Sequence, residues 1–259
     1  MKVWLKHSIF TISIAVFCVG VALILHSDKQ EMSVCDCRDV KVEIIGEHEF
    51  VTVADVNNYI SKEYGQVVGQ RTNAIRLHEI ESILDSKSAV QKSEVWITTD
   101  GVMHVVIRQR EPAARFQKGD TGFYVDDRGY IFPLHKTYTA PVPLVSGSIP
   151  VYVGGNYKGP AATAPERKWL GEILDLLDYI GSSRHWKSCF SSITVRSNGD
   201  LVLKAAEGEE SFIFGAPDDF AKKFYRIDKY YTEIAPLKAE GYYKTVNVKF
   251  NGQIVCRQK

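Results

Sequence analysis

The stretch VIRQREPAARF (106–116) decides how this chain is organised. It begins as a strand, rich in β-branched residues, and then places Arg108, Arg110 and Glu111 directly before Pro112. Proline has no N–H to donate to a sheet and holds the preceding residue extended, so one strand must end here. The chain resumes at once, which predicts a rigid junction between two domains. The alternating arginines are expected on the solvent face of the first strand.

Upstream of this junction, the pattern predicts the order strand, helix, helix, strand, strand over residues 39–111. Alternating apolar and polar residues in 39–50 indicate the first strand. Helical spacing follows from Thr52 and again around Leu77 to Leu84. Asp100-Gly101 stands between two β-rich runs and predicts a hairpin with a type I′ turn.

Downstream of Pro112, the pattern predicts a mixed domain of short strands and two helices. One helix is expected over 166–181 and an amphipathic one over 216–237, with hairpins at Asn198-Gly199 and Asn251-Gly252. On the second helix, Phe224, Ile227 and Tyr231 are expected to face the core. The basic residues are expected on its exposed face, either solvated or facing a partner; they are Lys222, Lys223, Arg226 and Lys229. Residues 148–165 are predicted to be a loop.

The N-terminal region predicts a single membrane anchor. Lys2 and Lys6 precede an uncharged apolar run that covers roughly 26–30 Å as a helix, close to the thickness of a bilayer core. We expect a cytoplasmic tail over 1–8, a transmembrane helix over 9–27, a linker over 28–38 and the remaining chain outside. A cleavable signal peptide is the alternative, but Leu25-His26-Ser27 is a poor cleavage site.

Charge and cysteine content narrow the functional classes. A formal net charge of +1 provides no basic field for nucleic acid. Four cysteines lie outside the anchor, at Cys35, Cys37, Cys189 and Cys256, without the spacing of a metal site. They are interpreted as incidental thiols, and a disulfide among them is the alternative.

No catalytic or cofactor motif is found. GGNYKGP (154–160) lacks the ending of a phosphate loop, and VSGS (145–148) is no nucleophile elbow. Asp126 and Asp127 are adjacent carboxylates in a turn, where aspartate commonly binds its own backbone. The histidines are scattered. We therefore expect no catalytic residues, no metal, no cofactor and no small-molecule substrate.

The order of these parts resembles the bacterial cell-division family FtsQ/DivIB. REPAARF (110–116) corresponds to the family's interdomain junction, at Arg110, Glu111, Pro112 and Ala114. VDDRGYIF (125–132) corresponds to its Val-Asp-x-x-Gly hairpin, and VNVKFNGQIV (246–255) to its closing strands. Where the family often has Asp, Arg and Tyr, this chain has Asn247, Lys249 and Phe250.

The resemblance implies an α+β protein with one N-terminal transmembrane helix. A small POTRA (polypeptide-transport-associated) domain of β-α-α-β-β order is expected over 39–111, and a β domain with a mostly antiparallel sheet over 112–259. The implied function is a non-enzymatic divisome scaffold, in the inner membrane and at midcell, that links septum assembly to septal peptidoglycan synthesis. Its implied partners are FtsB/DivIC-like and FtsL-like single-pass proteins, with other divisome components recruited through the POTRA domain.

The resemblance also places the main partner site at the last strand, which is expected at an edge of the sheet. An edge strand can pair with a strand of another protein. The residues expected to bind are Phe250, Gln253, Ile254, Val255, Cys256 and Arg257. The alternative is that Ile254 and Val255 only close the core. Alternative functions are a membrane-anchored cell-wall enzyme, which lacks a visible nucleophile, and another POTRA-containing envelope-assembly protein.

Overall fold

A computed structural model provides the structure, which describes residues 35–154, 156–239 and 241–258. The predicted tail, membrane helix and most of the predicted linker lie outside these residues. Within the described ranges, no helix is both long and apolar enough to cross a membrane.

The chain forms two compact units whose boundary runs through the first three strands. Unit 1 comprises the residues up to Glu43, Val53–Leu84 and Ser93–Val106, and unit 2 comprises Ile44–Thr52, Asp85–Lys92 and Ile107 onward. Residues 44–45, 90–92 and 107–109, which belong to the first three strands, therefore group with unit 2. The segments 46–52 and 85–89 group with them.

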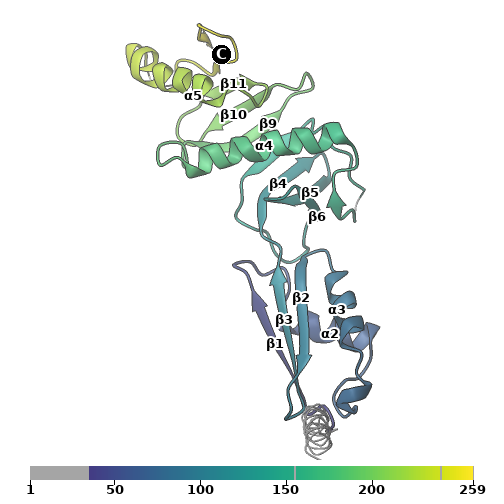
Figure 1. Ribbon diagram of the computed structural model, residues 1–259. Coiled ribbons are helices and arrows are strands. Elements are labelled where there is room, and N and C mark those ends of the chain that lie inside the picture. Colours follow the sequence, from purple (N-terminus) through teal and green to yellow (C-terminus); the bar gives the residue numbers. More distant parts are fainter. Residues whose placement is uncertain (1–34, 155, 240, 259) are drawn as a thin grey trace, which may run out of the picture. The chain divides into compact units, whose positions relative to one another are not determined.

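The first part of the chain has the predicted order of elements (Figure 1). A three-stranded sheet has the order β1-β3-β2. The elements are β1 (Asp39–Ile45), α2 (Val53–Glu63), the 3₁₀ turn η1 (Thr72–Ala74), α3 (Leu77–Asp85), β2 (Val90–Ile97) and β3 (Val102–Gln109). Each helix buries one apolar stripe, as helical spacing predicts: Val56 and Ile60 on α2, Ile80 and Leu84 on α3.

The β2–β3 hairpin differs from the predicted turn type. A type I′ turn needs positive φ at both central residues, but among the described non-glycine residues only Asp219 has a positive φ. Gly101 has φ +84° and donates its N–H to the Thr98 carbonyl at 2.9 Å. The loop is therefore of the three-residue kind that a left-handed glycine closes, and Asp100 keeps ordinary backbone angles.

Unit 2 contains a ten-stranded sheet of order β13-β12-β11-β10-β9-β7-β4-β5-β6-β8. Pairing is parallel for β4 with β7, β7 with β9 and β11 with β12, and antiparallel elsewhere. The strands are β4 (Pro112–Lys118), β5 (Thr121–Asp126), β6 (Tyr130–Pro133), β7 (Leu144–Gly147), β8 (Gly159–Pro160), β9 (Phe190–Val195), β10 (Leu201–Ala205), β11 (Ser211–Gly215), β12 (Thr245–Asn247) and β13 (Val255–Arg257). The α+β class is confirmed. β8 lies within the segment predicted as a loop and pairs with β6.

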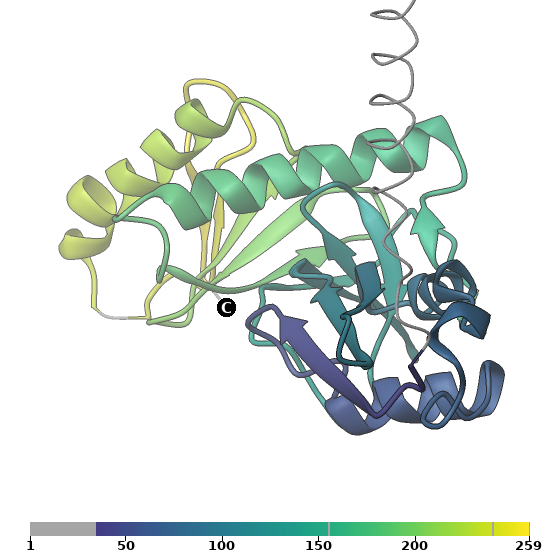
Figure 2. The same ribbon diagram turned by 60° about the horizontal axis from the view of Figure 1, so that its bottom comes forward.

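Two helices cover this sheet. Figures 1 and 2 show α4 (Ala164–Ser182) crossing the strands, and α5 (Phe220–Lys229) lying toward β11. Leu170, Ile173 and Leu176 of α4 share one apolar core with Phe224 and Ile227 of α5. This shared core fixes α5 on the sheet and positions the surface beside the last strands.

A π-helical turn, η2 (Tyr230–Ile234), follows α5 and leads to the 3₁₀ turn η3 (Ala235–Leu237). A π turn takes in more residues than an α turn, which shifts the phase of the helix. Tyr230 is buried at ordinary helical spacing from Ile227, whereas Tyr231, predicted to face the core, is 38% exposed. The helix also starts later than predicted, after Asp219 in the left-handed conformation.

The junction is short, and its second arginine is not on the solvent face as predicted. Only Arg110 and Glu111 separate β3 from β4, and Pro112 is the first residue of β4. The Arg110 guanidinium donates to the Asp126 carboxylate at 3.0 Å and lies 3.5 Å from the centre of the Tyr130 ring. These partners, all within unit 2, draw Arg110 inward, whereas Arg108 remains exposed.

Candidate functional site

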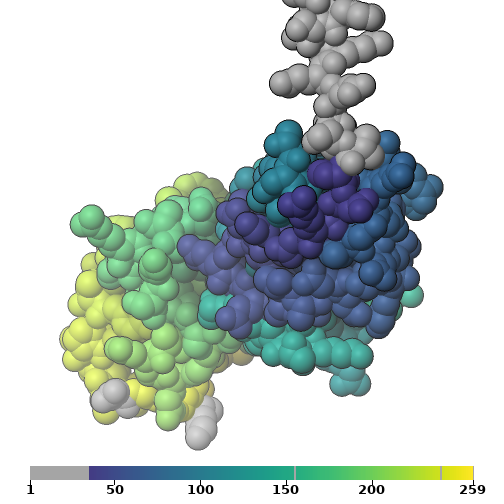
Figure 3. Space-filling view, turned by 90° about the horizontal axis from the view of Figure 1, so that it is seen from below, coloured from purple at the N-terminus to yellow at the C-terminus, as the bar shows by residue number. Residues whose placement is uncertain are grey.

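The last strand, β13, lies at one edge of the ten-stranded sheet. It pairs antiparallel with β12, and within the described chain no strand lies on its other side. N–H and C=O groups of alternate residues on that side are open to a further strand. The opposite edge, β8, has two residues, of which Pro160 has no N–H. The C-terminal residues, yellow in Figure 3, lie on the surface of unit 2.

The six residues predicted as a partner site lie along β13 and in the turn before it. Val255 is 38% and Phe250 is 45% exposed. Ile254 and Cys256 are partly buried and pack against the core. Burial raises the pKa of the Cys256 thiol, which therefore stays protonated at neutral pH. The remaining two residues, Gln253 and Arg257, are exposed.

A groove of about 700 Å³ lies next to this edge. It lies between α5 and the turn that precedes β13. Its lining residues are Ala221, Lys222, Tyr225, Arg226, Lys229, Ile234, Gly252, Gln253 and Ile254. Tyr225 is 60% exposed although it is aromatic. The sequence interpretation missed this groove, although a tyrosine on the polar face of an amphipathic helix was a visible signal.

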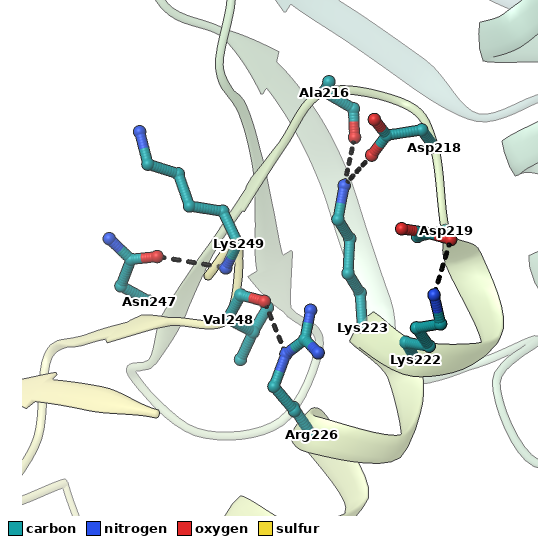
Figure 4. Close-up of polar contacts among 9 residues, drawn as sticks. All are labelled: Ala216, Asp218, Asp219, Lys222, Lys223, Arg226, Asn247, Val248 and Lys249. Atoms are coloured by element: carbon teal, nitrogen blue, oxygen red, sulfur yellow. Dashed lines mark hydrogen bonds and ion pairs between the residues drawn. The ribbon is translucent and has the colours of Figure 1, made fainter. Parts of the chain in front are cut away.

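The basic residues of α5 do not all lie on an exposed face, which corrects the sequence-based prediction. Lys223 is 4% and Arg226 is 8% exposed. Lys223 donates to the Ala216 carbonyl at 2.7 Å and pairs with Asp218, as Figure 4 shows. Because the segment before α5 folds over the helix end, it supplies acceptors that a helical pattern cannot reveal.

Arg226 connects α5 to the strands at the edge. Its Nε donates to the Val248 carbonyl at 2.7 Å (Figure 4). Its Nη2 is buried and has no hydrogen-bond partner among the described residues, although Arg226 lines the groove. A buried donor without a partner carries a free-energy cost.

An ion pair holds the segment between β12 and the following turn. The Lys249 ammonium lies 2.8 Å from the Asp200 carboxylate, which also accepts from the Asn198 amide at 3.0 Å. Burial acts to raise the pKa of Asp200, but the bonds from Lys249 and Asn198 and the nearby positive charges outweigh it, and the pKa is lowered.

This lowered pKa predicts a pH-dependent contribution to stability. The Asp200 carboxylate should stabilise the fold above its unfolded pKa of about 3.9, and the contribution should be lost as pH falls through the lower folded pKa. Asp200→Asn should therefore lower the melting temperature at pH 7 and make a smaller difference near pH 3. Thermal unfolding of both proteins across this range measures the effect. A constant difference between pH 7 and pH 3 would refute the assignment.

Asp126, one of the two adjacent carboxylates considered for catalysis, has a structural role. The Asp126 carboxylate accepts from the backbone N–H groups of Arg128 at 3.0 Å and Tyr130 at 2.8 Å, which confirms its role in the turn. Across the part of the chain that the structure describes, no three His, Cys, Asp or Glu residues gather as a metal site would require.

Two family models match this chain. The model described as FtsQ/DivIB, C-terminal related, matches residues 111–257, more than half of the chain. The model described as a POTRA-like domain matches residues 35–108. No curated protein matches the sequence.

Proposed function

Because this chain belongs to the family described as FtsQ/DivIB, C-terminal related, and carries a POTRA-like domain before that region, we propose that it is a non-enzymatic scaffold of cell division. It binds other single-pass division proteins and helps to link septum assembly to septal peptidoglycan synthesis. Residues 9–27 anchor it in the inner membrane, with residues 1–8 in the cytoplasm.

One observation supports this proposal most: the open edge of β13 lies beside a groove. The edge offers backbone groups for an added strand, and the groove offers an exposed tyrosine and the basic side chains of Lys222 and Lys229. Together these features suit an extended segment with apolar and acidic side chains. We propose that a FtsB/DivIC-like protein supplies that segment, with Phe250 and Gln253–Arg257 as its contacts.

Two further contacts belong to the proposal. A FtsL-like protein joins through the same assembly, and the POTRA-like domain recruits other divisome components. The scaffold lies at midcell in dividing cells. Residues 39–111 and 112–259 are proposed as its two outer domains.

The function can be tested by depletion and rescue. Depleted cells should grow into filaments because septation stops, and the full chain should restore their length. Tyr225→Ala should weaken binding to the FtsB/DivIC-like protein by about tenfold or more, since buried tyrosines are common binding hot spots. The measurements are cell length by microscopy and affinity by interferometry with the full chain.

Tyr152→Ala is the matched control, because Tyr152 is 82% exposed and lies outside the groove. It should bind the partner and restore division like the unaltered chain. Normal division after complete depletion would contradict the scaffold, whereas unchanged affinity of Tyr225→Ala would place the partner away from the groove.

A further inference from the structure

A second cavity in unit 2, of about 370 Å³, is walled by tyrosines. Tyr230 and Tyr231 come from the π-helical turn, and Tyr242 and Tyr243 from the segment before β12. The rings meet nearly edge to face. Tyr230 and Tyr231 are 5.2 Å apart at 67°, and Tyr242 and Tyr243 are 4.8 Å apart at 87°. Tyr231 and Tyr242 are 38% and 39% exposed, whereas Tyr230 is buried.

A buried carboxylate completes this cavity. Glu210 lines the cavity, although this residue is only 8% exposed. Its Oε1 accepts from the Tyr230 hydroxyl at 3.3 Å, while its Oε2 is buried and has no hydrogen-bond partner among the described residues. Burial and the negative charge of Glu210 raise the pKa of Tyr231 to about 12.

Two lysines bind the neighbouring residue, Glu209, rather than Glu210. Lys204 donates to the Glu209 carbonyl at 2.7 Å, and Lys244 pairs with the Glu209 carboxylate. No ion pair to Glu210 occurs in the described part of the chain. A buried carboxylate without a cation is costly, and a bound cation would offset that cost.

The chemistry of the walls selects the kind of cation. Tyrosine faces attract organic cations through the ring quadrupole, and a carboxylate fixes an ammonium by charge-assisted hydrogen bonds. The chain itself shows this attraction at the cavity, where the Lys238 ammonium lies 5.2 Å from the centre of the Tyr242 ring. The alkyl chain that carries an ammonium would pack against the remaining aromatic surface.

We propose that this cavity binds the alkylammonium end of a lysine-type side chain, held by Glu210 against the exposed rings of Tyr231 and Tyr242. The ligand is a peptide side chain of another molecule. This site is distinct from the edge of β13 and does not rest on the function proposed above.

The probe is Nα-acetyl-lysine methylamide, titrated into the full chain with ¹³C-labelled tyrosine rings. We expect saturable shifts of the Tyr230, Tyr231, Tyr242 and Tyr243 signals. Nα-acetyl-norleucine methylamide, which has the alkyl chain without the charge, should bind at least about tenfold more weakly. Equal binding of the two probes would overturn the proposal.

Glu210→Gln should weaken lysine-probe binding by about tenfold or more, because it removes the charge and keeps the side-chain shape. Glu47→Gln is the matched control, because Glu47 is exposed and does not line the cavity. Tyr231→Leu removes one wall at a partly exposed position and should also weaken binding. Full affinity in Glu210→Gln, or a loss in Glu47→Gln as large as in Glu210→Gln, would refute the site.

Discussion

Val255→Pro and Cys256→Pro should affect different properties: one variant should lose partner binding and the other should lose stability. Successive N–H groups of a strand point to opposite sides, so one of these two faces β12 and the other faces outward. Removing the outward donor should weaken binding of the FtsB/DivIC-like partner by about tenfold or more and leave the melting temperature nearly unchanged. Removing the inward donor should destabilise the last hairpin by about 1–3 kcal/mol.

The paired design supplies its own control. Both variants change one residue of the same strand, and both introduce the same ring. Affinity is measured by interferometry and stability by thermal unfolding of the full chain. If both variants keep full affinity, the partner does not add a strand to β13. If both variants lose affinity only in proportion to their loss of stability, β13 contributes to the core and not to binding. That result would support the alternative that Ile254 and Val255 only close the core.

Arg110→Ala should lower the free energy of unfolding by about 3–5 kcal/mol, because it leaves a buried carboxylate without its cation. The two side chains are 13% and 4% exposed, so water should compensate only poorly for the lost guanidinium at Asp126. The variant also loses the contact between Arg110 and the Tyr130 ring. Denaturant unfolding of the full chain, followed by circular dichroism, measures the loss.

Two further variants make this prediction specific. Arg108→Ala, at the exposed arginine two residues earlier, should change stability by less than about 0.5 kcal/mol. Arg110→Met with Asp126→Asn should recover much of the loss, since Asn keeps the oxygen that accepts from the turn and no charge remains buried. A loss below about 1 kcal/mol for Arg110→Ala alone would show that the ion pair does not stabilise the junction.

Local features of this protein could be predicted from its sequence. Helix and strand periodicities identified α4, the β9–β10 hairpin and the order of elements in 39–111, because these patterns reflect the local geometry of the backbone. Pro112 marked the start of a new strand, because a missing N–H has the same consequence in any context. The turn at Gly101 was located correctly, but its type was wrong, because several turn types tolerate the same Asp-Gly pair.

The burial of charged side chains was decided only by the tertiary structure. Lys223, Arg226 and Arg110 occupy positions that periodicity assigns to solvent, yet each meets an acceptor. Long side chains can turn inward wherever a carbonyl or carboxylate offsets the loss of hydration, and those acceptors come from other segments of the chain. The groove beside β13 and the tyrosine cavity around Glu210 arise in the same way, from segments that only folding brings together. The sequence by itself therefore determined most of the elements and their order, whereas the folded chain decided which side chains meet and which polar atoms remain without a partner.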